Sequence, residues 1–135
     1  MRKYVRYHAG IPVDIVESKT ETSLDHPRLH NVSLGGIECE CEKHFPINTL
    51  VQVHIDILSP PFTVEGRIVW CKKVDSYYLF GIQFFGEMDI ARLRVVEQIS
   101  HIEHYRKEIR EQEGRNLTGE EAAKEWIEIY APHFP

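Results

Sequence analysis

Residues 36–42, GIECECE, alternate one by one between small or apolar residues and glutamates. The apolar side carries Ile37, Cys39 and Cys41. Because successive side chains of an extended chain point to opposite faces, this alternation predicts a strand with one buried and one solvent-facing side. We expect both cysteines to be small core residues. We expect Glu38 and Glu40 on the charged exterior, where they would not form an acid–base pair.

Similar alternation surrounds this stretch and accounts for most of the first 86 residues. Strands are predicted over residues 12–17, 49–58, 62–72 and 77–85, and a sixth short strand is expected near residues 21–29. Turn-rich joints such as Ser59-Pro60-Pro61 separate them. The predicted fold is mainly β, a small antiparallel six-stranded barrel.

After residue 86 the apolar period lengthens to three or four residues, which is typical of helices. A helix is predicted over residues 87–112 and ends before Gly114, and Thr118-x-x-Glu121 is a capping box that opens a second helix at 119–131. The apolar stripe predicted for the first helix comprises Ile90, Leu93, Val96, Ile99, Ile102, Tyr105 and Ile109. In and after the second helix, three aromatic residues could anchor a contact with another protein: Trp126, Tyr130 and Phe134.

This change of period divides the chain into two predicted parts, a β-barrel domain at residues 1–86 and a helical extension at residues 87–135. The extension either packs its apolar stripe on the barrel or forms an interface, with an effector protein or in a homodimer.

Composition limits the class of protein. The chain has 135 residues, of which 42% are hydrophobic and 27% charged, and its formal net charge is −5. These values are ordinary for a globular protein, and the negative charge argues against a DNA or RNA binder. No apolar run is long enough to insert in a membrane, and there is no secretory h-region. Three cysteines give neither a disulfide framework nor zinc spacing, so a cytoplasmic location is expected.

A local basic cluster lies at residues 1–8, which include Arg2 and Arg6 but no acidic residue. Guanidinium groups bind phosphate oxygens and guanine O6 and N7 through paired donors, and they also stack on bases. Two arginines four residues apart could therefore hold one anionic nucleotide. By itself, however, such a pair is more typical of a solvated basic segment.

A second motif, Asn31-Val32-Ser33-Leu34-Gly35-Gly36, is placed at the entry to the GIECECE strand. Asn31 and Ser33 are suited to hold a turn and to meet a guanine edge. Gly35 and Gly36 permit positive φ angles and close approach of a ligand. The neighbouring His30 would either contact a base or cap a loop. Alone, this motif is also typical of an ordinary turn before a strand.

Together and in this order, the two motifs resemble those of the PilZ domain family. The family pattern is R-x-x-x-R, followed by Asp or Asn, any residue, Ser, two more residues and Gly. Arg2, Arg6, Asn31, Ser33 and Gly36 occupy its slots. The segments GRIVWC at 66–71 and LFGIQFF at 79–85 are also similar to late strands of the family.

The resemblance implies a stand-alone receptor for cyclic di-GMP that changes conformation or partner on binding. It implies that the two arginines clamp the ligand, that Asn31 and Ser33 read a base, and that Gly36, with Gly35 beside it, leaves room for the ligand. It implies no catalysis and no cofactor.

Two other classes of function remain open. One is a PilZ-like adaptor that works by protein contact without the ligand. The other is a small metal-dependent enzyme, suggested only by His101 and His104 on one helix with Glu97 and Glu108 nearby. Because no matching ligand set occurs elsewhere, we expect no metal site, and no nucleophile–base arrangement is evident.

Overall fold

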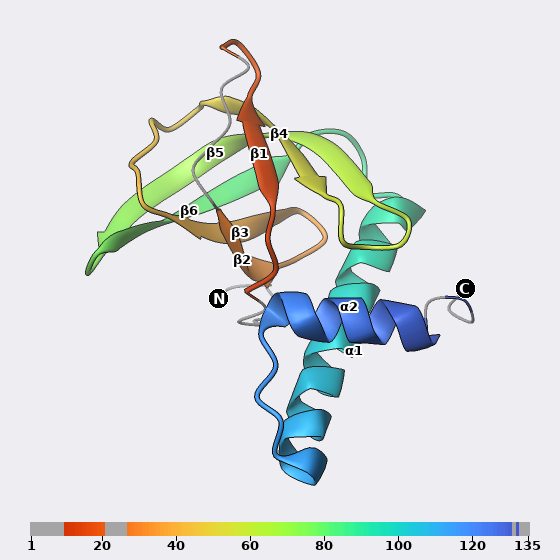
Figure 1. Ribbon diagram of the computed structural model, residues 1–135. Coiled ribbons are helices and arrows are strands. Elements are labelled where there is room, and N and C mark those ends of the chain that lie inside the picture. Colours follow the sequence, from red (N-terminus) through yellow and green to blue (C-terminus); the bar gives the residue numbers. More distant parts are fainter. Residues whose placement is uncertain (1–9, 21–26, 131, 133–135) are drawn as a thin grey trace.

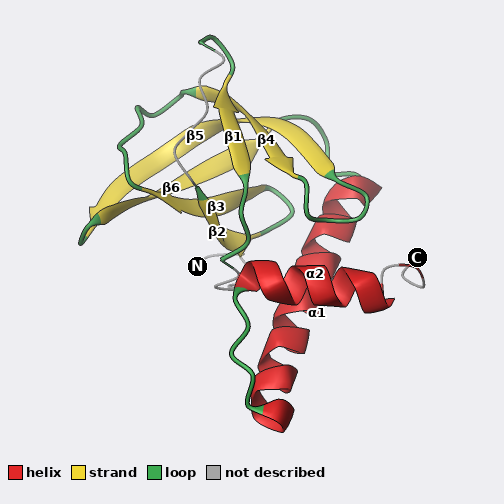
Figure 2. Cartoon of the chain, viewed as in Figure 1, coloured by secondary structure: helices red, strands yellow, loops and turns green. Residues whose placement is uncertain are grey.

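A computed structural model describes residues 10–20, 27–130 and 132 of the chain. It contains a six-stranded antiparallel sheet followed by two helices, as predicted (Figure 1 and Figure 2). The strands are β1 (Asp14–Glu17), β2 (Arg28–Val32), β3 (Gly36–Cys41), β4 (Leu50–Ile55), β5 (Phe62–Val74) and β6 (Tyr77–Phe84). The helices are α1 (Ile90–Glu113) and α2 (Gly119–Tyr130).

The sheet has the strand order β1-β4-β5-β6-β3-β2 and curls into a half-barrel. Its two edge strands approach each other where the chain leading into β1 meets β2. Gly10 N–H donates to Leu29 O over 3.0 Å, Leu29 N–H donates to Ile11 O over 2.9 Å, and Val13 N–H donates to Pro27 O over 3.3 Å. These bonds satisfy backbone groups that an open edge would leave unpaired.

The sixth strand was predicted near residues 21–29, but β2 lies at Arg28–Val32. This placement makes Asn31 a strand residue and not part of the turn. The reason is that β2 is short and carries an irregular register against β3, so its sequence shows no two-residue alternation.

Both helices bury their inner faces in the same apolar cluster as the strands. The capping box is confirmed, since Thr118 N–H donates to Glu121 Oε1 over 2.9 Å and Glu121 N–H donates to Thr118 Oγ1 over 3.1 Å. α1 begins after the N-cap Asp89, which accepts from Arg92 N–H, and ends at Gly114 in the left-handed conformation. The prediction of two domains divided at residue 86 stays a prediction.

The predicted apolar stripe of α1 is wrong at its first two residues, whereas Val96 packs against the core as predicted. Ile90 and Leu93 are 72% and 46% exposed, whereas Arg92 and Gln98 face inward and are buried. Arg92 donates from its guanidinium to Phe85 O. Gln98 Nε2 donates to Ser59 O over 2.7 Å. These two polar side chains bind loop carbonyls and so occupy the inner face that the pattern gave to apolar residues.

α2 crosses α1 and is held against it by aromatic and polar contacts (Figure 1). Trp126 stacks on His101 with ring centroids 5.8 Å apart, and Tyr105 Oη donates to Glu125 Oε1 over 2.9 Å. Trp126 is only 5% exposed, so the proposal that it anchors an external contact is wrong. Tyr130 is 47% exposed. Phe134 lies outside the described residues.

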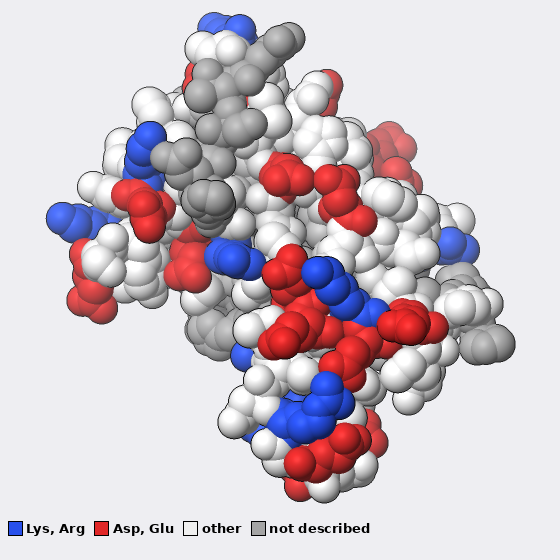
Figure 3. Space-filling view, in the orientation of Figure 1, with Lys and Arg blue, Asp and Glu red and all other residues white. Residues whose placement is uncertain are grey.

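Charged side chains of both signs gather over the helical part on the face shown in Figure 3. In the helical part, Arg115 pairs with Glu125 at 2.6 Å and Lys124 pairs with Glu120 at 3.8 Å. No described helix is long and apolar enough to cross a membrane.

Candidate functional site

The turn between β2 and β3 is locked by Ser33. Its backbone N–H donates to Gly36 O over 2.9 Å, and its hydroxyl donates to the same carbonyl over 3.1 Å. Gly36 N–H in turn donates to Ser33 Oγ over 3.2 Å. A fourth bond, from Phe84 N–H to Gly35 O over 2.9 Å, ties the turn to the end of β6. Ser33 therefore sets the shape of the turn from within.

The two glycines of the turn are not explained by positive φ angles. Within the described residues, the glycines with positive φ are Gly10, Gly86 and Gly114. Position 36 requires a glycine because of close packing, since an added Cβ would lie 2.1 Å from Ile82 O of β6. At Gly35 an added Cβ would meet nothing within 4 Å, so the fold itself leaves that position open.

A β-bulge places two polar side chains of β2 beside the turn. Leu29 pairs with Cys39 and Asn31 pairs with Glu38, so that His30 is the extra residue between them. Because a bulge sets two residues against one, it can turn His30 and Asn31 toward the same side of the sheet. Asn31 Nδ2 donates to Glu38 Oε1 over 3.0 Å, and His30 Nδ1 lies 3.3 Å from the same oxygen.

The environment of Glu38 differs from the prediction. Glu38 is 3% exposed and lies among polar partners, whereas Glu40 is half-buried. The alternation correctly gave the face of the strand, and Cys39 and Cys41 are buried as predicted. The alternation could not show that the outer face is buried at Glu38, because this burial depends on side chains of the neighbouring strands.

Asn31 has one unsatisfied atom in the described part of the chain. The side chain is 3% exposed, and its Oδ1 is buried without a hydrogen-bond partner. A buried acceptor left unpaired costs about 1–3 kcal/mol. In native folds such an unpaired buried group usually has a specific reason, such as a functional role or a bound water or ion.

The row that contains Asn31 and Glu38 continues across two more strands to Gly81 and Trp70. An added Cβ at Gly81 would lie 2.2 Å from Trp70 Nε1, so the indole ring occupies the space above this glycine. Trp70 follows a second bulge, between Ile68 and Trp70. The sequence analysis missed this contact of Trp70 with Gly81, although a glycine inside a strand indicates that another group approaches the backbone closely.

Arg67 supplies positive charge in the row two residues further along the strands, which also contains Gln83 and Gly36. Its guanidinium donates to Gln83 Oε1 over 3.2 Å and to Asn48 Oδ1 over 3.0 Å. Both partners are neutral amides. These two hydrogen bonds therefore bring no negative charge to the guanidinium, which is a group suited to bind an anion.

Four of the six predicted site residues, Asn31, Ser33, Gly35 and Gly36, are described and lie together at this hairpin. Arg2 and Arg6 lie outside the described residues. Within the described ranges, no group of three or more His, Cys, Asp or Glu side chains could hold a metal ion.

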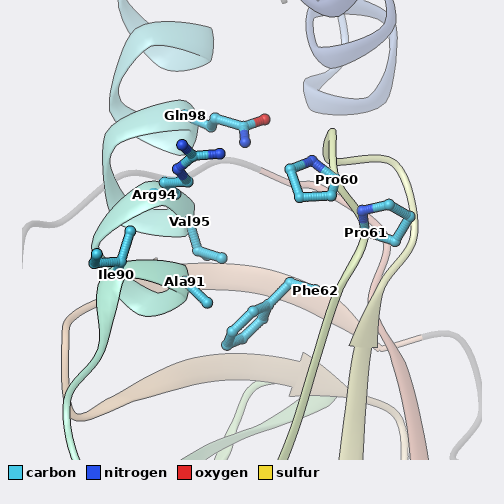
Figure 4. A pocket seen from close by; sticks show the side chains of 8 residues that line it. All are labelled: Pro60, Pro61, Phe62, Ile90, Ala91, Arg94, Val95 and Gln98. Carbon is cyan, nitrogen blue, oxygen red and sulfur yellow. The ribbon is translucent and has the colours of Figure 1, made fainter. Parts of the chain in front are cut away.

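A separate groove of about 230 Å³ lies between the loop at Pro60 and Pro61 and the first turns of α1 (Figure 4). Phe62 and Ile90 contribute apolar walls, and Arg94 contributes one positive charge. Apolar walls with a single cation suit an apolar side chain better than a doubly charged nucleotide. None of the residues of the turn between β2 and β3 lines this groove.

These features define a small antiparallel β domain that carries a rigid polar turn on a curled sheet. The chain belongs to the PilZ domain family, whose model matches residues 1–101. A comparison with curated protein sequences gives no match.

Solved structures share the fold at low sequence identity. The PilZ domain of Escherichia coli YcgR with c-di-GMP matches with a TM-score of 0.62 and 16% identity, over 84% of this chain and 98% of that one. The PilZ domain of CeSA from a cellulose-synthesizing bacterium matches with a TM-score of 0.55 and 18% identity, over 72% and 99%. Bacillus subtilis MotI/DgrA, an inhibitor of motility, matches with a TM-score of 0.55 and 15% identity, over 75% and 50%.

Proposed function

We propose that this protein is a receptor for cyclic di-GMP and not an enzyme. The observation that carries the proposal is the rigid turn at residues 33–36 beside the buried, unpaired Oδ1 of Asn31. Family membership and the R-x-x-x-R motif support it. The structurally similar YcgR domain was determined with the same ligand.

Each motif residue takes a distinct role in this proposal. Arg2 and Arg6 clamp phosphate and guanine groups, which require paired planar donors. Asn31 reads a base through its free oxygen, and Ser33 holds the turn that presents it. Gly35 leaves space for the ligand to approach the backbone.

Calorimetric titration with cyclic di-GMP tests this proposal on the wild type and on Arg6→Ala. Loss of a charged hydrogen bond is expected to weaken binding by about 10-fold or more. Arg110→Ala is a matched control, because Arg110 is exposed on α1, a helix that contains none of the motif residues, and this variant is expected to bind like wild type. No binding by wild type with ligand in large excess would refute the receptor function.

Binding is proposed to change the conformation of the junction between β6 and α1. The turn contacts this junction through the bond from Phe84 N–H to Gly35 O. Arg92 of α1 then binds Phe85 O and lies 5.4 Å from the centre of the Phe84 ring. Hydrogen exchange over residues 84–95 should change when cyclic di-GMP is added, and unchanged exchange would argue against an output through α1.

An effector protein and a homodimer are the proposed partners, and the cytoplasm is the proposed location. Met88, just before α1, and Ile90 and Leu93, in its first turn, are exposed and favour a protein contact there. This exposure also favours the alternative, an adaptor that acts without the ligand. Light scattering with and without cyclic di-GMP tests for a homodimer that the ligand controls. For such a homodimer the molar mass is expected to change on adding the ligand, and Ile90→Asp is expected to abolish this change.

A further inference from the structure

The buried pair of Asn31 and Glu38 fixes which end of the asparagine amide is free. An amide has a donor nitrogen and an acceptor oxygen, and a half-turn of the side chain exchanges them. A carboxylate only accepts, so the Asn31 nitrogen must face Glu38, and it does so at 3.0 Å. The oxygen is thereby turned away from Glu38 and is left buried without a partner in the described part of the chain.

An aspartate at position 31 would not need such a partner, because both of its oxygens are acceptors. The family motif admits Asp or Asn at this position, and this chain has Asn. Guanine offers the ring N1–H and the exocyclic N2–H₂ as donors on one edge, and an acceptor is required to bind them. An asparagine can meet these donors only if its amide is held in one orientation.

We propose that Glu38 is a positioning residue that holds the Asn31 oxygen toward the guanine of the ligand, so that Asn31 acts as an aspartate-like acceptor. The proposal rests on the proposed function, because it concerns how the same site recognises its base. His30 supports this role, since its Nδ1 lies 3.3 Å from the same Glu38 oxygen. The carboxylate is thus contacted by both residues that the β2 bulge brings together.

A reciprocal exchange tests the proposal in the full chain by titration with cyclic di-GMP. Asn31→Asp places two carboxylates about 3 Å apart and removes the donor, so binding is expected to weaken by about 10-fold or more. Adding Glu38→Gln to it supplies a donor that binds one oxygen of the introduced carboxylate and leaves the other oxygen free. The double variant is expected to recover to within about 3-fold of wild type.

Glu38→Ala gives the complementary measurement. Without its anchor the Asn31 amide can turn, and affinity is expected to fall by about 3- to 10-fold while Asn31 itself is unchanged. Thermal unfolding of every variant separates a loss of binding from a loss of folding. If Glu38 had only a structural role, replacing it would lower the stability of the fold. The double variant with Asn31→Asp and Glu38→Gln would then show no recovery of affinity.

Two results would overturn the proposal. One is a folded double variant that binds as weakly as Asn31→Asp alone, and the other is a folded Glu38→Ala variant that binds like wild type. Failure of the wild type to bind cyclic di-GMP would instead refute the proposed function, so the two failures are distinguishable.

Discussion

Replacing Gly36 with alanine should destabilise the fold, whereas the same change at the adjacent Gly35 should not. The added Cβ at Gly36 would lie 2.1 Å from Ile82 O, about 0.9 Å inside the 3.0 Å limit that real Cβ contacts respect. The obstructing atom belongs to the backbone of β6, which pairs with every residue of β3 and cannot swing aside. The two variants therefore differ above all in the space that the added Cβ would find.

The expected cost follows from this geometry. Overpacking that forces the backbone to shift typically costs about 1–3 kcal/mol, and we place Gly36→Ala at the upper end of this range because the contact is backbone to backbone. A chain of this size loses about 3–5 °C of melting temperature per kcal/mol, so a decrease of roughly 6–15 °C is expected. Gly35→Ala should be unchanged or more stable by up to about 1 kcal/mol, because alanine restricts the unfolded chain.

Urea titration followed by circular dichroism measures both free energies of unfolding under one set of conditions. Equal stabilities of Gly36→Ala and Gly35→Ala, within about 0.5 kcal/mol, would refute the packing argument. The same two proteins separate folding from recognition. If the ligand approaches the backbone at the open position, Gly35→Ala should bind cyclic di-GMP more weakly although its stability is intact.

Three further measurements test other parts of the structure. Thr118→Ala removes the side-chain acceptor of the α2 capping box and should lower the free energy of unfolding by about 1 kcal/mol, measured by urea titration; no change would mean that the cap is not formed in solution. Hydrogen bonds from Arg115 and then Tyr105 hold the pKa of Glu125 below its usual 4.5, so the ionised form stabilises the fold above that pH. The difference in urea midpoint between wild type and Arg115→Ala should therefore be largest at neutral pH and shrink as the pH falls below 4.5; a difference independent of pH would contradict this. Burial raises the pKa of the Cys39 thiol, whereas Cys71 is only half-buried, so iodoacetamide at about pH 8 should label Cys71 first by mass spectrometry, and early labelling of Cys39 would place it outside the core.

The sequence alone predicted the class of fold and the place of the turn. Alternation over residues 36–42 and in the other long strands is a local property of an extended chain, so β3 to β6 lie within a few residues of their predicted bounds. The capping box at Thr118 and Glu121 is equally local and is confirmed. The resemblance to the PilZ family was found because the motif residues have a fixed order and spacing, and the family is confirmed.

The surroundings of the motif were decided by tertiary structure. A β-bulge exists only relative to a partner strand, so the sequence could not show that His30 and Asn31 share a side or that Trp70 covers Gly81. Burial of Glu38 likewise depends on what neighbouring strands place over it, and a charged residue alternating with apolar ones is otherwise expected in solvent.

The first turns of α1 show the same limit. Its polar residues Arg92 and Gln98 face inward because loop carbonyls of Phe85 and Ser59 lie there as hydrogen-bond partners. A pattern of apolar spacing contains no information about those carbonyls, which lie 7 and 39 residues away in the chain. The sequence therefore determined the elements and the motif, and long-range pairing decided which polar groups are buried and which of their atoms remain free to bind.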